Sequence, residues 1–142
     1  MADFRDLLKQ FKGFGFPEGQ YAVFGSGPMV VRGIKEGGDL DIMVKDELFA
    51  ELTKNYPIIK KQDVDYIKIA DDIEICSAKD SGFDQPDMVI ERAEIIDDVK
   101  FVLLSDTVSW KKRIGRPKDF EHIALIKKYL ENKNDMENPF VK

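Results

Sequence analysis

The chain of 142 residues has little of several residue types that carry enzyme chemistry. Its single cysteine, Cys76, cannot form an internal disulfide, as is usual in a reducing cytosol. Its single histidine, His122, has no second histidine or cysteine at metal-ligand spacing, which disfavours a zinc site or a histidine-rich phosphohydrolase. We therefore interpret His122 as an ordinary helix residue and Cys76 as a small buried side chain.

A net positive charge and a long apolar run are both lacking. The net charge of −5 disfavours binding to bulk DNA, which needs a basic surface. No signal peptide and no apolar run of membrane-spanning length is recognisable, so we expect a cytoplasmic protein without a membrane partner. The basic side chains do cluster near the end of the chain, where they would provide a local field for a triphosphate: Lys111, Lys112, Arg113, Arg116 and Lys118.

The known glycine-rich nucleotide motifs are missing too. No glycine-lysine phosphate loop is present, and the Gly13-x-Gly15 stretch does not follow a strand. Neither a P-loop enzyme nor a dinucleotide-binding fold is indicated. The apolar content of 43% and the charged content of 35% are typical of a globular protein, and we expect one domain over residues 1–142.

What is present is an alternation of helical and strand patterns, which predicts an α/β (α+β) fold with a small mixed β-sheet flanked by helices. We expect helices at residues 4–11, 28–34, 47–55 (capped by Asp46), 105–114 and 117–130. We expect strands at residues 21–24, 39–44, 66–69, 73–78, 94–96 and 101–104. The polar tail from about residue 132 is expected to be frayed.

The most informative motif is Gly25-Ser26 followed by Asp39-Leu40-Asp41. Residues two apart on a strand point to the same face, so the two aspartates are expected to project together. Paired carboxylates repel unless a cation intervenes, and oxygen ligands of this kind suit Mg²⁺ or Mn²⁺. A Gly-Ser turn that opens a helix offers backbone N–H groups to a phosphate. These are the two halves of a phosphoryl-transfer site.

With Glu74 as a third acidic residue on a later strand, this pattern resembles that of the nucleotidyltransferase superfamily, which has a polymerase-β-like fold. The stretch TVSWKKRIGRPKDFEHIALIKKYL is similar to the C-terminal helix pair of small stand-alone bacterial or archaeal members, some of which are related to abortive-infection toxins. The resemblance extends from about residue 20 to about residue 130. It implies transfer of a nucleoside monophosphate from a nucleoside triphosphate to a hydroxyl-bearing acceptor, which would be a small molecule, an RNA or a protein.

The resemblance also implies a role for each site residue. Asp39, Asp41 and Glu74 would hold two Mg²⁺ (or Mn²⁺) ions, with Glu74 next to the acceptor as the base or orienting group. The nucleotide phosphates would be bound by the Gly25-Ser26 turn and, as further contacts, by Arg32 and Lys118.

Each assignment has a structural alternative. Gly25-Ser26 would also serve as a simple strand-to-helix turn, and the two aspartates as solvated charges on an edge strand. The position of Glu74 depends on a hairpin register that the sequence does not fix; a turn of Asp71-Asp72 alone would pair it with Ile69. Structural roles are equally open for Arg116, Lys118 and Asp119. The alternative function is a catalytically inactive nucleotide-binding protein, or a toxin–antitoxin component, of the same fold.

Overall fold

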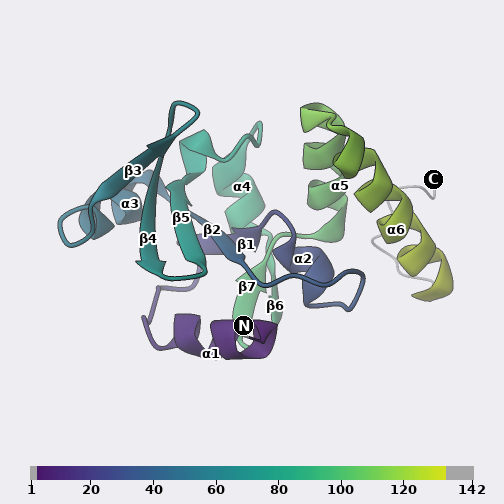
Figure 1. Cartoon of the computed structure of the whole chain (residues 1–142), viewed down its shortest axis with the longest axis horizontal. Helices are drawn as coiled ribbons and strands as arrows, with labels where there is room; N and C mark the ends of the chain where they lie inside the picture. The colour runs from purple at the N-terminus through teal and green to yellow at the C-terminus, as the bar shows by residue number, and fades with distance from the viewer. Residues whose placement is uncertain (1–2, 134–142) are drawn as a thin grey trace.

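A single mixed sheet organises the chain in the computed structural model, which describes residues 3–133 (Figure 1). Its seven strands lie in the order β3-β4-β5-β2-β1-β7-β6. The pairs β2–β5 and β1–β7 are parallel and the other neighbours are antiparallel. The strands are β1 (Tyr21–Phe24), β2 (Leu40–Val44), β3 (Ile58–Lys61), β4 (Val64–Ala70), β5 (Ile73–Ser77), β6 (Glu94–Ile96) and β7 (Val99–Phe101). The expected mixed α/β fold is thus confirmed.

Helices cover both faces of this sheet. α1 and α3 pack against one face, and α4 packs against the other. The last two helices form a pair beside the sheet (Figure 1). The helices are α1 (Phe4–Lys12), α2 (Gly27–Val30), α3 (Asp46–Leu52), α4 (Pro86–Glu91), α5 (Leu104–Ile114) and α6 (Pro117–Lys133), with a short 3₁₀ turn, η1 (Ala78–Asp80).

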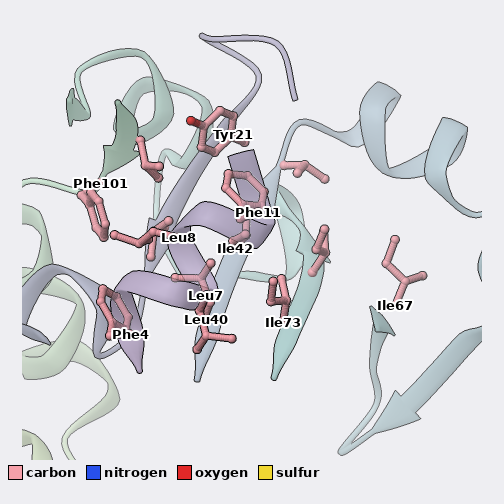
Figure 2. Packing of buried hydrophobic residues seen from close by; sticks show 14 residues of the cluster. Phe4, Leu7, Leu8, Phe11, Tyr21, Leu40, Ile42, Ile67, Ile73 and Phe101 are labelled. Atoms are coloured by element: carbon pink, nitrogen blue, oxygen red, sulfur yellow. The ribbon is translucent and has the colours of Figure 1, made fainter. Parts of the chain in front are cut away.

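The larger core lies between α1 and the sheet. The apolar side chains of α1 recur at helical spacing, so all of them face the sheet. They meet every second residue of β2, whose alternation places Leu40, Ile42 and Val44 on this face (Figure 2). Because β2 lies between β5 and β1 and its apolar residues are fully buried, it is a central strand and not the edge strand of the structural alternative.

The opposite face of β2 and β5 is apolar along one part of the strands and acidic along the part before it. Met43 and Cys76 are buried in the cluster that includes Val89 and Ile90 of α4. Asp41 lies two residues before Met43, and Glu74 lies two residues before Cys76. The two carboxylates therefore project from the same face of the sheet as Met43 and Cys76. Their side chains reach a cavity beyond the α4 cluster.

The α5–α6 pair is fixed by local turn chemistry and by packing. Gly115 ends α5 in the left-handed conformation (φ +69°), and its N–H donates to the Lys111 carbonyl at 2.9 Å. Pro117 then begins α6, where its missing N–H costs nothing. Met29 after the Gly25-Ser26 turn packs with Leu104 and Val108 of α5 and with buried residues of α6, which ties the pair to α2.

Most predicted elements are confirmed, with shifted ends. β1 has the predicted bounds, and the turns at Asp71-Asp72 and Asp97-Asp98 lie where expected. β2 begins at Leu40, so Asp39 precedes the strand. β7 begins at Val99, two residues earlier than predicted, and α2 is only one turn long. α6 continues to Lys133; the rest of the predicted frayed tail lies outside the described residues.

Two predictions were wrong or incomplete. Asp46 does not cap α3 but is its first residue; its carboxylate accepts hydrogen bonds from the Ser77 hydroxyl and the Lys79 N–H. β3 and α4 were not predicted at all.

Within residues 3–133, no helix combines the length and apolarity needed to cross a membrane.

Candidate functional site

A cavity of about 820 Å³ lies between the sheet and the α5–α6 pair. Its wall contains five of the seven residues assigned to the site from the sequence: Gly25, Ser26, Asp41, Glu74 and Lys118. These residues come from the turn after β1, from β2, from β5 and from the start of α6. The fold thus brings together segments that are far apart in the sequence.

The Gly25-Ser26 turn lies directly against Asp41. Gly25 has a left-handed backbone (φ +68°), and a Cβ built on it would lie 3.3 Å from Oδ2 of Asp41. Phe24, the last residue of β1, pairs with Asp41 across the sheet. Glycine at position 25 therefore allows the turn and leaves room for the carboxylate.

Asp41 lies at the centre of a group of negative charges. It is paired in register with Glu74 across the parallel strands β2 and β5. Burial, followed by the charges of Glu74 and Asp39, raises its pKa from 3.8 to about 6, while the ammonium of Lys61 acts in the opposite direction. The negative charges near Asp41 thus outweigh the positive charge of Lys61, and such an environment is suited to a cation.

Glu74 has a more polar setting than the sequence alone suggests. A register shift between Lys68 and Ala70 places Lys68, rather than Ile69, opposite Glu74. The Glu74 carboxylate accepts a hydrogen bond from the Lys61 ammonium, with 2.8 Å between Nζ and Oε2. In the described part of the chain, no three acidic, histidine or cysteine side chains are gathered into a ready metal-binding group. Lys61, rather than a second acidic side chain, is thus the partner that the structure gives to Glu74.

Asp39 and Arg32 do not line the cavity. Asp39 is exposed just before β2, although its charge still acts on Asp41. Arg32 forms an ion pair with Glu94 of β6 and donates a hydrogen bond to the Pro28 carbonyl at 2.8 Å. These contacts direct Arg32 away from the cavity, so its predicted phosphate contact finds no support in its position.

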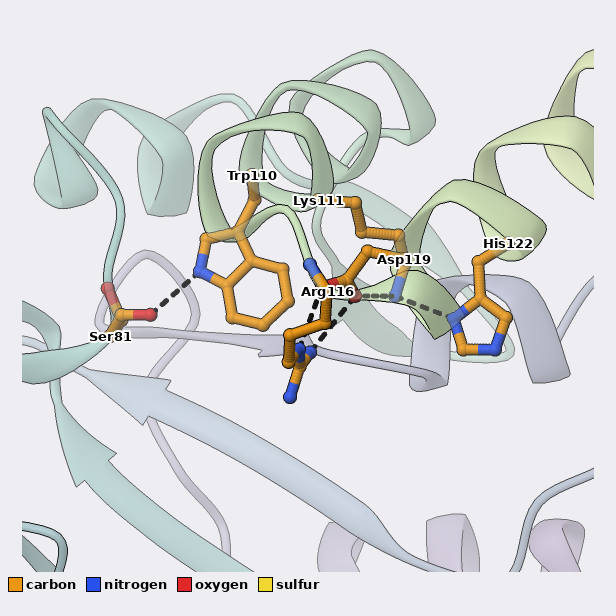
Figure 3. Close-up of polar contacts among 6 residues, drawn as sticks. All are labelled: Ser81, Trp110, Lys111, Arg116, Asp119 and His122. Carbon is orange, nitrogen blue, oxygen red and sulfur yellow. Dashed lines mark hydrogen bonds and ion pairs between the residues drawn. The ribbon is translucent and has the colours of Figure 1, made fainter.

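The opposite wall of the cavity is basic and tightly organised (Figure 3). Asp119 is fully buried and accepts hydrogen bonds from the Arg116 side chain at 2.7 and 3.0 Å. These bonds lower its pKa from 3.8 to about 2. The ammonium of Lys111 lies 3.6 Å from Asp119 and 3.0 Å from Nδ1 of His122. Burial lowers the pKa values of both Lys111 and His122.

Trp110 belongs to the same wall of the cavity. Its indole N–H donates to the Ser81 carbonyl at 2.8 Å (Figure 3). Its ring packs with Phe24 and Phe83. The Arg116 guanidinium lies 5.6 Å from the centre of the ring. Arg116 is therefore held on two sides, by an aromatic ring and by a carboxylate, before any ligand binds.

Sequence reasoning did not assign several residues of the cavity wall to the site, among them Lys61, Trp110 and His122. Lys61 belongs to β3, which was not predicted, so nothing in the sequence pointed to its contact with Glu74. Trp110 lies next to the basic cluster recognised in the sequence, and an aromatic residue in that position was an available signal. Lys111 was recognised only as part of the charge cluster.

No protein-family model matches the chain, and no curated protein sequence matches it significantly. Its function must therefore be inferred from the cavity and its side chains.

Proposed function

We propose that the chain is a metal-dependent nucleotidyltransferase with a polymerase-β-like fold, which moves a nucleoside monophosphate from a nucleoside triphosphate to a hydroxyl-bearing acceptor. The observation that carries this proposal is the pairing of Asp41 with Glu74 on the cavity wall, beside the Gly25-Ser26 turn and opposite a basic wall. Acidic groups for a metal and basic groups for phosphates are both needed for nucleotidyl transfer.

The acidic side chains fit a divalent cation in their chemistry. Asp41 and Glu74 line the cavity, whereas Asp39 lies just before β2, outside it. All three offer only carboxylate oxygens, the ligands that Mg²⁺ and Mn²⁺ prefer. The raised pKa of Asp41 supports this assignment, because a cation would relieve the repulsion that causes part of the shift. When bound, Mg²⁺ or Mn²⁺ would polarise the phosphates and lower the pKa of the acceptor hydroxyl.

The remaining roles follow from position. The Gly25-Ser26 turn and Lys118 would bind the triphosphate, joined by Arg116 and Lys111 of the basic wall. The acceptor oxygen would form a bond to the α-phosphorus while the bond to pyrophosphate breaks. Glu74, once free of Lys61, would take the hydroxyl proton.

The acceptor itself stays open among a small molecule, an RNA and a protein. A cytoplasmic location belongs to the same proposal, because the free, buried Cys76 requires no oxidising compartment.

A second candidate function is nucleotide binding without catalysis, as a sensor or as part of a toxin–antitoxin pair. The specific observation in its favour is the Lys61–Glu74 ion pair, which occupies the third carboxylate. If Glu74 never leaves Lys61, Asp41 is the one carboxylate of the proposed metal set that remains available on the cavity wall.

The direct test is transfer of label. The protein is incubated with Mg²⁺, each of the four α-³²P-labelled ribonucleoside triphosphates and a cell extract, and label is followed onto small molecules, RNA and protein. We expect transfer by the wild type, loss in Asp41→Asn and Glu74→Gln, and no change in the exposed-turn control Asp71→Asn. Because Glu74 is assigned to the acceptor side, Glu74→Gln should reduce transfer far more than triphosphate binding. Full activity in Glu74→Gln, or no transfer with any nucleotide, would favour the non-catalytic alternative.

A further inference from the structure

Lys61 is positioned as the cation of the acidic site. It is the last residue of β3, just before the tight turn at Gln62 and Asp63, both of which have positive φ values (51° and 65°). Its ammonium reaches past β4 to Glu74 on β5, where Nζ lies 2.8 Å from Oε2. It also lies 5.6 Å from the centre of the Tyr66 ring.

The positive charge of Lys61 serves two carboxylates. It is hydrogen-bonded to Glu74, and it partly offsets the negative charges around Asp41. These are the carboxylates that the proposed function assigns to a divalent cation. An ammonium and a divalent cation repel each other, so the two compete for Glu74.

We propose that Lys61 is a displaceable internal cation, which holds Glu74 in the metal-free protein and is released when a divalent cation binds between Glu74 and Asp41. This inference rests on the proposed function, because it requires a metal site at these carboxylates. The Lys61–Glu74 ion pair thereby raises the concentration of divalent cation that is needed to fill the site between Glu74 and Asp41.

The hairpin is suited to such a release. All four residues of β3 are exposed, and β3 is an edge strand with a partner on one side only. The Lys61 side chain is 52% exposed, so it can leave Glu74 without disturbing the core. Lys61 and the basic wall line the same cavity, so the phosphates of a bound triphosphate would offer the released ammonium a new partner.

Direct cation binding tests the proposal without any activity assay. Mn²⁺ is titrated by calorimetry into the wild type, Lys61→Met, Lys61→Arg and Lys60→Met. Lys60 is the matched control, because it lies on the same strand but pairs with Asp65, at 3.6 Å. We expect Lys61→Met to bind Mn²⁺ about three- to tenfold more tightly, on the order of one lost charge repulsion in water. Lys61→Arg and Lys60→Met should bind like the wild type.

A second measurement on the wild type follows the lysine itself. The rate of amine acetylation at Lys61 is measured by mass spectrometry with and without Mn²⁺, using Lys60 in the same peptide region as the reference. Release of Lys61 predicts faster acetylation at Lys61 with Mn²⁺ and an unchanged rate at Lys60.

The outcomes separate the two proposals. If the wild type binds Mn²⁺ but Lys61→Met binds it equally or more weakly, and Lys61 acetylation does not change, the displacement is wrong while the metal site stands. If neither the wild type nor Lys61→Met binds Mn²⁺ with or without a triphosphate, the metal site and the proposed function both fail, and the displacement fails with them.

Discussion

Gly25 and Asp41 are in such close contact that a Cβ at position 25 would lie 3.3 Å from Oδ2 of Asp41. Gly19, in the loop before β1, also has a positive φ (+87°), but a Cβ there would meet nothing within 4 Å. Substitution of either glycine by alanine strains the backbone, but only substitution of Gly25 also crowds the Asp41 carboxylate.

Both Gly25→Ala and Gly19→Ala should lower the free energy of unfolding by about 1–2 kcal/mol, the cost of a left-handed alanine. Only Gly25→Ala should also weaken Mg²⁺-dependent triphosphate binding, because its methyl group pushes against Asp41. Urea unfolding and calorimetry measure the two effects. Equal binding by both variants would show that the contact does not matter for the ligand.

The metal-free protein should be more stable when Asp41 is neutral. Because its folded pKa of about 6 is above the ordinary 3.8, its contribution to stability is full below pH 4 and is lost as the pH rises through 6. In EDTA at pH 7, the free energy of unfolding of Asp41→Asn should exceed that of the wild type by about 3 kcal/mol, and the difference should vanish below pH 4. A clear drop in the melting temperature of Asp41→Asn at pH 7 would instead identify Asp41 as a structural partner.

Asp119 should behave in the opposite way, as a structural carboxylate. Its removal leaves Arg116 and the buried Lys111 without their shared partner, so Asp119→Asn should cost about 3–5 kcal/mol at pH 7. Because its folded pKa is lowered to about 2, this contribution is present above pH 4 and is lost as the pH falls through 2. Glu121→Gln, at an exposed position of α6, serves as the control in urea unfolding and should change stability by less than ~0.5 kcal/mol.

Lys118 should contribute to triphosphate binding from the start of α6. It lines the cavity, and we expect Lys118→Ala to weaken the affinity for Mg²⁺-triphosphate about fivefold, roughly the loss of one partly exposed charge contact. Lys128→Ala, at an exposed position further along α6, should leave the affinity unchanged. Equal effects of the two substitutions would indicate only a general charge effect.

The parts of the site that could be predicted from sequence are local ones. The Gly25-Ser26 turn, the alternation of β2 that exposes Asp41 on one face, and the Gly115 end of α5 each depend on a few neighbouring residues. Short-range backbone preferences suffice to place them.

The parts that could not be predicted depend on tertiary context. The pairing of Glu74 with Lys68 requires a register shift in β4 that no residue pattern announces. β3 has the sequence IIKK, with every residue exposed, so it lacks the alternation by which strands are recognised. The family resemblance implied a phosphate contact for Arg32, but its ion pair with Glu94 of β6 directs it elsewhere.

The most direct test of the central claim is the cation dependence of triphosphate binding. Non-hydrolysable analogues of the four nucleoside triphosphates, with the α–β bridging oxygen replaced, are titrated by calorimetry into the wild type and Asp41→Asn, with Mg²⁺ and in EDTA. The account predicts binding of at least one analogue by the wild type only with Mg²⁺, and none by Asp41→Asn. Binding of equal strength in EDTA, or by Asp41→Asn with Mg²⁺, would contradict it.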